Sequence, residues 1–367
     1  MKQVNHIRES NFELLRIIAM LLIVFHHVDL IIPLWPKDIS FFQSIMIDFF
    51  GAFGKVGVNI YVLITGYFMW NRQIKTKAWI RVIVETQFYA WIALLFGILI
   101  GYSFGFKEIL TYIFPILFSF RWFATAYVIL YLLIPLVNIS IKKCNFTTLL
   151  SAIFVLVFTL SIMPTIGLKP AYSDVAWLIM IYIIGGIINK YNLFSKVNIS
   201  VQKTSVLIIF CLLFVVSIII LTTYIFRKLA IYTLDPDYFM IQNSSFLSLI
   251  ISIIIFYAFS KIRFSSIKVN AFAGLMFGIY LIHAPIFKMI LPKAINLSEL
   301  SKNGSLFYSY LILMPILVFI VFAGVEYLRK AILGSFFESY ITAVSNKIDK
   351  GSNLLKSKIE NAKLDSE

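Results

Sequence analysis

The sequence predicts an all-α, polytopic integral membrane protein with about ten transmembrane helices. Of its 367 residues, 60% are hydrophobic and only 13% are charged. Soluble domains average about 45–50% apolar and about 25% charged residues, so this composition excludes a soluble fold of similar size. A helix needs about 20 apolar residues to cross the hydrocarbon core, because each residue adds about 1.5 Å. Apolar runs of roughly this length occupy residues 12–32, 50–70, 79–101, 122–141, 147–167, 175–189, 205–226, 244–260, 271–291 and 306–328.

One further apolar segment, residues 107–120, is too short for an eleventh span and contains Pro115. We expect it to form a re-entrant or interfacial piece. The basic residues predict the orientation of the spans. With the N-terminus inside, 22 of the 32 lysines and arginines lie on the cytoplasmic side, as the positive-inside rule requires. Both termini are therefore expected to be cytoplasmic.

The chain divides into a transmembrane domain, residues 1–330, and a cytoplasmic polar tail, residues 331–367. The tail alternates lysine with leucine and isoleucine and ends in acidic residues. Two interpretations of the tail stay open at this point. It is either an amphipathic helix on anionic lipid or a solvated and partly disordered segment.

The first apolar run contains Arg16 near its start and His26–His27 near its far end. Arg16 and His27 are eleven positions apart, which is three helical turns plus ~20°. They therefore share one helix face, ~16 Å apart along the axis, whereas His26 is turned ~80° away from Arg16. Ionisable groups inside a membrane helix mark functional sites by default. The alternative is a packing histidine with an arginine that snorkels to the surface.

The predicted orientation sorts the polar groups of the spans into two layers. Two of the four histidines, His27 and His283, fall in the outer half on different helices. Other charged residues at or near that outer face are Asp29, Lys55, Arg121 and Lys288. The basic residues of the inner layer are Arg16, Arg72, Lys75, Lys77 and Arg81.

The two layers suit different chemistry. A histidine titrates near neutrality and can act as base or acid, whereas Arg and Lys bind phosphate. The pattern indicates a path from a cytoplasmic, phosphate-bearing donor to an outer acceptor. The alternative is that the inner layer is basic only because of the positive-inside rule and binds no phosphate.

The sequence lacks the motifs of several other catalytic and binding sites. The sequence contains no Gly-rich phosphate loop followed by Lys-Ser/Thr, no His-Glu-x-x-His and no Gly-x-Ser-x-Gly. Its two cysteines, Cys144 and Cys211, have no metal-ligand spacing and give no disulfide framework. We therefore expect no metal site.

Four segments in order resemble the membrane-bound acyltransferase-3 family, bacterial enzymes that acetylate surface glycans. They are LLRIIAMLLIVFHH, GVNIYVLITGYF (Gly57–Phe68), WFATAYVILYLLIPLVN (Trp122–Asn138) and GIYLIHAPIF (Gly278–Phe287). Arg16 and His27 stand at the spacing of that family's first-helix arginine and histidine. The resemblance implies a transmembrane acyltransferase domain of ten core helices in the bacterial plasma membrane. It also implies acetyl-CoA as the cytoplasmic donor and a hydroxyl of an extracytoplasmic polysaccharide or lipid-linked glycan as the acceptor.

The resemblance also implies roles for particular residues. It makes His27 the catalytic residue, as general base or as transient acyl carrier. We add His283 as a second catalytic candidate that orients the acceptor or shares a proton; the alternative is that it packs the ninth helix before Pro285. The residues placed on the CoA side are Arg16, Lys75, Lys77 and Arg81.

This chain departs from the family pattern in three places. Thr65 stands where the family usually has Ser. The basic loop reads Lys75-Thr-Lys77 followed by Arg81 where the family often has Arg-x-Arg, which leaves open which residue holds phosphate. Only a short tail follows the last predicted helix. We therefore expect the acceptor to reach the membrane domain directly, or a separate extracytoplasmic partner to relay the acyl group.

Two other classes fit a polytopic protein that is basic on its inner side. A glycan or lipid-glycan transporter would need a central cavity but no CoA site, and would form no covalent product. A glycan polymerase usually shows a large outer loop with paired arginines, and here only residues 227–228 hold adjacent basic residues in an outer loop. Mass spectrometry of the surface glycan, with and without the gene, distinguishes these classes from an acyltransferase. The sequence does not identify the acceptor sugar or its hydroxyl, the acyl group, or the oligomeric state.

Overall fold

The computed structural model describes residues 9–36, 38–163, 173–197, 199–229 and 245–364. All regular structure in these ranges is helical, which confirms the all-α prediction. The first elements are α1 (Ser10–Phe25), the π-helix η1 (His26–Ile31), α2 (Phe41–Gly51), α3 (Gly54–Met69), α4 (Thr76–Leu99), α5 (Phe106–Ile113), α6 (Trp122–Lys143), α7 (Phe146–Val157) and the π-helix η2 (Phe158–Ile162). They are followed by α9 (Asp174–Lys190), α10 (Leu193–Lys196), α11 (Val201–Lys228), α13 (Phe246–Ser260), α14 (Ile267–Ala273), α15 (Met276–Ala294), α16 (Leu297–Lys302) and α17 (Gly304–Leu364).

Each of the ten predicted spans contains a helix of the structure. In the described residues, six helices are long and apolar enough to cross a membrane, or seven when α14 and α15, bent by 42°, count as one span. The protein is therefore a polytopic membrane protein, and the total of ten spans stays a prediction. The short helix α5 falls in the segment that we expected to be re-entrant or interfacial.

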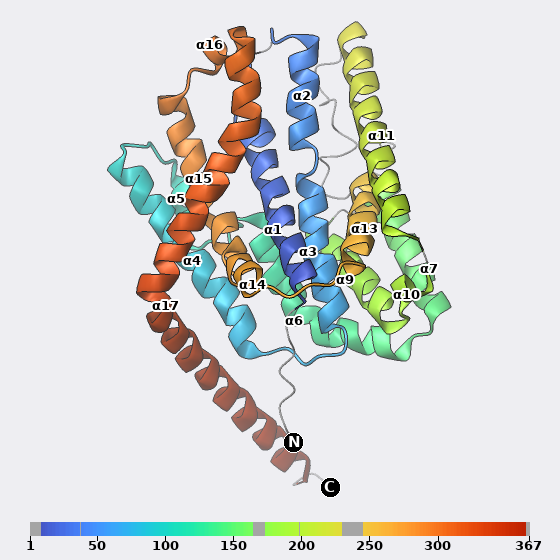
Figure 1. Ribbon diagram of the computed structural model, residues 1–367. Helices are drawn as coiled ribbons and strands as arrows, with labels where there is room; N and C mark the ends of the chain where they lie inside the picture. The colour runs from blue at the N-terminus through green and yellow to red at the C-terminus, as the bar shows by residue number, and fades with distance from the viewer. Residues whose placement is uncertain (1–8, 37, 164–172, 198, 230–244, 365–367) are drawn as a thin grey trace.

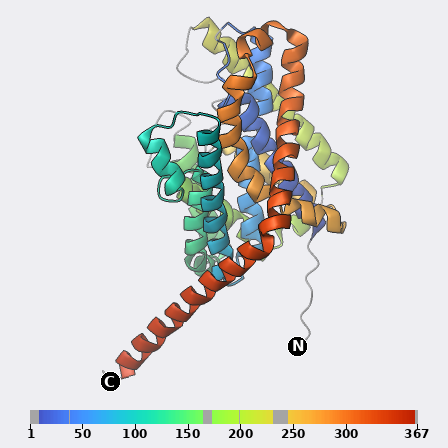
Figure 2. The same ribbon diagram turned by 90° about the vertical axis from the view of Figure 1, so that its left-hand side faces the viewer.

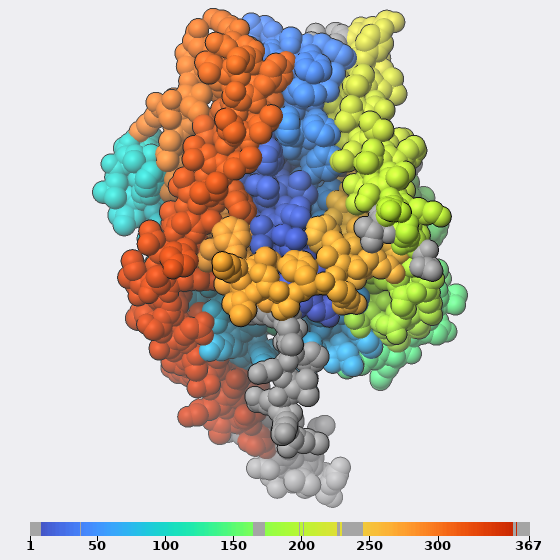
Figure 3. Space-filling view, in the orientation of Figure 1, coloured from blue at the N-terminus to red at the C-terminus, as the bar shows by residue number. Residues whose placement is uncertain are grey.

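The long helices stand side by side as a bundle (Figures 1 and 2), in which α1 contacts α3, α13, α14, α15 and α17. The start of α1 and the end of α17 lie at the same end of the bundle. This arrangement agrees with two termini on one side of a membrane, and their cytoplasmic location stays a prediction. Figure 3 shows α14 crossing over the N-terminal end of α1. The Ser10 hydroxyl hydrogen-bonds Asn270 of α14 at 2.8 Å and thereby fixes this crossing.

Helices α3 and α9 approach each other closely because glycines lie at their contact. A Cβ atom at Gly66 of α3 would lie 2.1 Å from the carbonyl oxygen of Tyr182 in α9. Only glycine permits this separation, as in many membrane helix pairs. The Asn138 side chain of α6 donates to the Met69 carbonyl at 3.0 Å and accepts from the Tyr182 hydroxyl at 2.8 Å. These contacts hold α3, α6 and α9 together.

The outward faces of the bundle are apolar. Ile209, Phe210 and Leu213 of α11 are 55–65% exposed, which is the surface that a lipid environment favours. On the opposite side, α17 continues without a break across residue 330 and leaves the bundle at an angle (Figure 2). Its extension contacts α4, where Phe337 and Ile341 pack against Ile80. The described part of the predicted tail is therefore helical.

Candidate active site

A π-helix begins at His26 and contains both adjacent histidines. The chain is α-helical up to Phe25, and the wider turn of η1 is marked by a bond from the Ile32 amide to the His27 carbonyl at 3.0 Å. Such π-helical turns recur at functional sites. His26 is 5% exposed, and its Nδ1 donates to the Gly51 carbonyl at 2.7 Å. His26 therefore anchors η1 to the junction of α2 and α3.

His27 contacts His283 of α15. Its Nδ1 lies 3.1 Å from Nε2 of His283, and Nδ1 of His283 lies 2.6 Å from the Ile279 carbonyl oxygen. A carbonyl only accepts, so Nδ1 of His283 carries a proton and its Nε2, in the neutral ring, accepts from His27. The proton of neutral His27 is then on Nδ1, which leaves its Nε2 with a free lone pair. His283 is fully buried whereas His27 is half-buried.

Two cations interact electrostatically with this histidine pair. Among the charged groups, Arg121 has the strongest electrostatic interaction with His27, and it also interacts with His283. The Arg121 guanidinium lies 4.7 Å from the ring centre of Tyr280, one turn before His283 on α15. Lys55 packs over the Trp122 ring at 4.9 Å and interacts with Asp174.

A cavity of about 730 Å³ lies in the inner layer, between α1, α3, α4, α6 and the end of α14. Its lining includes Arg16, Arg72, Thr65, Tyr127 and Tyr131. The Arg16 guanidinium is paired with Glu13 at 2.5 Å. Arg72, in contrast, has no carboxylate oxygen within 4.0 Å among the described residues. The Thr65 hydroxyl contacts the Tyr127 hydroxyl at 3.2 Å.

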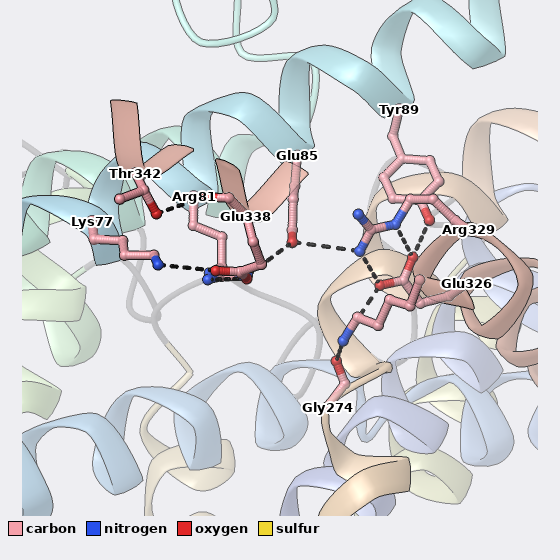
Figure 4. Close-up of polar contacts among 10 residues, drawn as sticks. Lys77, Arg81, Glu85, Tyr89, Gly274, Glu326, Arg329, Glu338 and Thr342 are labelled. Atoms are coloured by element: carbon pink, nitrogen blue, oxygen red, sulfur yellow. Dashed lines mark hydrogen bonds and ion pairs between the residues drawn. The ribbon is translucent and has the colours of Figure 1, made fainter. Parts of the chain in front are cut away.

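The basic residues at the start of α4 have a different environment. Lys77 and Arg81 both pair with Glu338 of α17, at 3.0 Å and 2.5 Å (Figure 4). Lys75 is exposed and precedes the first residue of α4. Lys77 and Arg81 do not line the inner cavity themselves; each directly precedes a residue that does, Ala78 and Val82. The tail helix thus neutralises two of the cations that we expected on the CoA side.

A buried ion cluster joins α4 and α17 beside this contact (Figure 4). Arg329 binds Glu326 through Nε and Nη2, both at 2.7 Å, and its Nη2 lies 3.5 Å from Glu85. The Tyr89 hydroxyl donates to Glu326, and Lys330 donates to the carbonyl of Gly274, which lines the inner cavity. The cluster therefore fixes α4, α14 and α17 around one wall of the cavity.

The structure thus unites some predicted site residues and separates others. His27 and His283 form a direct contact, whereas Arg16 lines the cavity about three turns of α1 further in. The straight helix assumed for this run was wrong beyond Phe25, since η1 begins there. Tyr127 and Tyr131 were not among the predicted site residues, although their spacing of four on one helix face was a usable signal.

The comparison with protein families agrees with this arrangement. The model of the acyltransferase-3 family, described as an acyltransferase domain, matches residues 9–325. No curated protein and no solved structure matches the chain. The match covers every helix that contributes to the histidine pair and to the inner cavity. The protein is therefore a member of the membrane-bound acyltransferase-3 family, and its activity is that of an acyltransferase.

Proposed function

We propose that this enzyme transfers an acyl group, acetyl first of all, from cytoplasmic acyl-CoA to an extracytoplasmic glycan. The acceptor is a hydroxyl of a cell-envelope polysaccharide or lipid-linked glycan, and the membrane is a bacterial plasma membrane. The observation that carries this proposal is the hydrogen-bonded pair of His27 and His283, 3.1 Å apart in the outer half of the bundle. A separate extracytoplasmic partner would be needed only where the glycan does not reach His27 itself.

The pair supplies a base with a defined tautomer. His283 is held by the Ile279 carbonyl and accepts from Nδ1 of His27, so Nε2 of His27 is free to take a proton. When the acceptor hydroxyl gives its proton to Nε2, its oxygen attacks the thioester carbonyl carbon. The C–S bond then breaks, and the CoA thiolate receives the proton from His27. The same free Nε2 would serve if His27 carried the acyl group transiently.

The inner cavity suits the phosphate-bearing part of the donor. Arg16 and Arg72 line it, and guanidinium groups bind phosphate through paired N–H donors. Lys75, Lys77 and Arg81 lie at or next to this region, so we keep them as donor-binding residues. A donor held there must extend its thioester by about 16 Å along α1 to reach His27. Two separate layers therefore allow one substrate to be bound from inside while the other is acylated outside.

Mass spectrometry of the surface glycan tests the proposal. We compare strains that carry no gene, the wild-type gene, and the His27→Gln variant at matched protein levels. We expect acyl-sized mass additions with the wild type only, because removing a general base lowers rates by about 10²–10⁴. Purified enzyme should also release CoA from labelled acetyl-CoA. Identical glycan masses in all three strains would favour a transporter.

A further inference from the structure

Arg121 is a cation that the described part of the chain does not neutralise. No carboxylate oxygen of the described residues lies within 4.0 Å of it. Its Nε is buried and has no hydrogen-bond partner there. The guanidinium is held over the Tyr280 ring at 4.7 Å, and its charge acts on both His27 and His283.

Two other cations of the bundle have a counter-charge. Arg329, in the inner layer, is bound by Glu326 at 2.7 Å, and Lys55, near the histidines, interacts with Asp174. A charge in a membrane bundle without a partner is costly and is retained where it serves function. An unpaired guanidinium beside a base is therefore placed to meet a negative charge that exists only during the reaction.

We propose that Arg121 stabilises the oxyanion that forms on the thioester carbonyl oxygen during acyl transfer. The inference rests on the proposed function and adds Arg121 to its catalytic groups. As the acceptor oxygen bonds to the carbonyl carbon, the π-electron pair of the C=O bond moves onto oxygen, and His27 holds the proton. Arg121 donates to that oxygen until the C=O bond reforms, the C–S bond breaks and the thiolate takes the proton. The Tyr280 ring keeps the guanidinium in place before the charge develops, which is the condition for strong stabilisation.

The test compares Arg121→Gln and Arg121→Lys in purified, lipid-reconstituted enzyme with acetyl-CoA and surface glycan. Lys288→Gln is the matched control, because it removes an exposed cation from the same helix as His283. Two rates are measured: transfer to the glycan, and hydrolysis of acetyl-CoA without glycan. Removing one oxyanion donor lowers kcat by about 10²–10³. We expect Arg121→Gln to lose both rates by this factor with unchanged KM for acetyl-CoA, Arg121→Lys to recover part of the loss, and Lys288→Gln to match the wild type.

Each other outcome has a definite meaning. Arg121→Gln rates within threefold of the wild type would overturn the oxyanion role. So would a raised KM for glycan with normal hydrolysis, because Arg121 would then recognise an anionic acceptor. Equal losses in the Gln and Lys variants together with a lowered Tm would assign it a structural role. A wild-type enzyme that neither transfers nor hydrolyses would instead refute the proposed function, and the inference with it.

Discussion

The buried ion cluster at Arg329 gives the most quantitative prediction. The side chains of Arg329, Glu326 and Glu85 are 6%, 1% and 7% exposed. Arg329→Gln removes the cation that Glu326 and Glu85 share, and leaves these buried carboxylates only the longer ion pairs with Lys330 at 3.7 Å and Arg81 at 4.0 Å. Removing one partner of a buried ion pair costs about 3–5 kcal/mol, because the remaining charge stays unpaired. We therefore expect the Tm of the detergent-solubilised protein to fall by several degrees.

The control lies further along the same helix. Glu338→Gln breaks the ion pairs with Lys77 and Arg81, whose side chains are 42% and 38% exposed. Exposed pairs contribute about 0–1 kcal/mol, so the Tm of this variant should hardly change. Thermal unfolding of both variants is followed by loss of the monodisperse chromatographic peak. Equally small shifts would refute the reasoning, since they would mean that water reaches the cluster and screens its charges.

Three further predictions concern the site and its orientation. His27→Gln should abolish glycan acylation with little change in Tm, whereas His26→Gln should lower the Tm and keep substantial turnover; the reverse pattern would move the catalytic role to His26. Glu338→Gln should strengthen acetyl-CoA binding in calorimetry, because it frees two cations near the inner cavity. An unchanged affinity would show that these two cations do not bind the donor. Reporter fusions after Lys143 and after Lys268 should both signal a cytoplasmic location, and an external signal from either would break the ten-span map.

The helical framework could be predicted from the sequence because lipid imposes a simple rule on it. Each run of apolar residues must satisfy its backbone hydrogen bonds internally, so the run becomes a helix. Every predicted span contains a helix for this reason, including α9, whose limits differ by one residue from the predicted 175–189 at each end. The turn from α1 into η1 could not be predicted, because no local pattern marks a π-helix.

The sequence predicted that the two histidines lie at a similar depth in the membrane, but not that they are in contact. Counting residues placed His27 and His283 in the same outer half, but their separation depends on the 42° bend before α15 and on the wider turn of η1. The contact between the tail helix and α4 was even harder to predict from the sequence. Glu338 belongs to a segment with two open interpretations, and its pairing with Lys77 arises because α17 continues without a break past residue 330 and packs against α4.

The sequence does not show which arginines are paired with a carboxylate of the protein. This pairing bears on which of them are available to bind a substrate anion. By residue type, Arg16, Arg329, Arg72 and Arg121 are equivalent. In the structure Arg16 and Arg329 are bound by carboxylates at 2.5 Å and 2.7 Å, and Arg16, which also lines the inner cavity, stays a donor-binding candidate. The other two have no such partner in the described residues, one lining the inner cavity and one beside the histidines. Arg72 is exposed, so its place in the cavity lining is what points to an anionic ligand, whereas Arg121 has a buried Nε without a hydrogen-bond partner in the described residues. A phosphate inside and an oxyanion outside are the two anions that acyl transfer from CoA would bring to these positions.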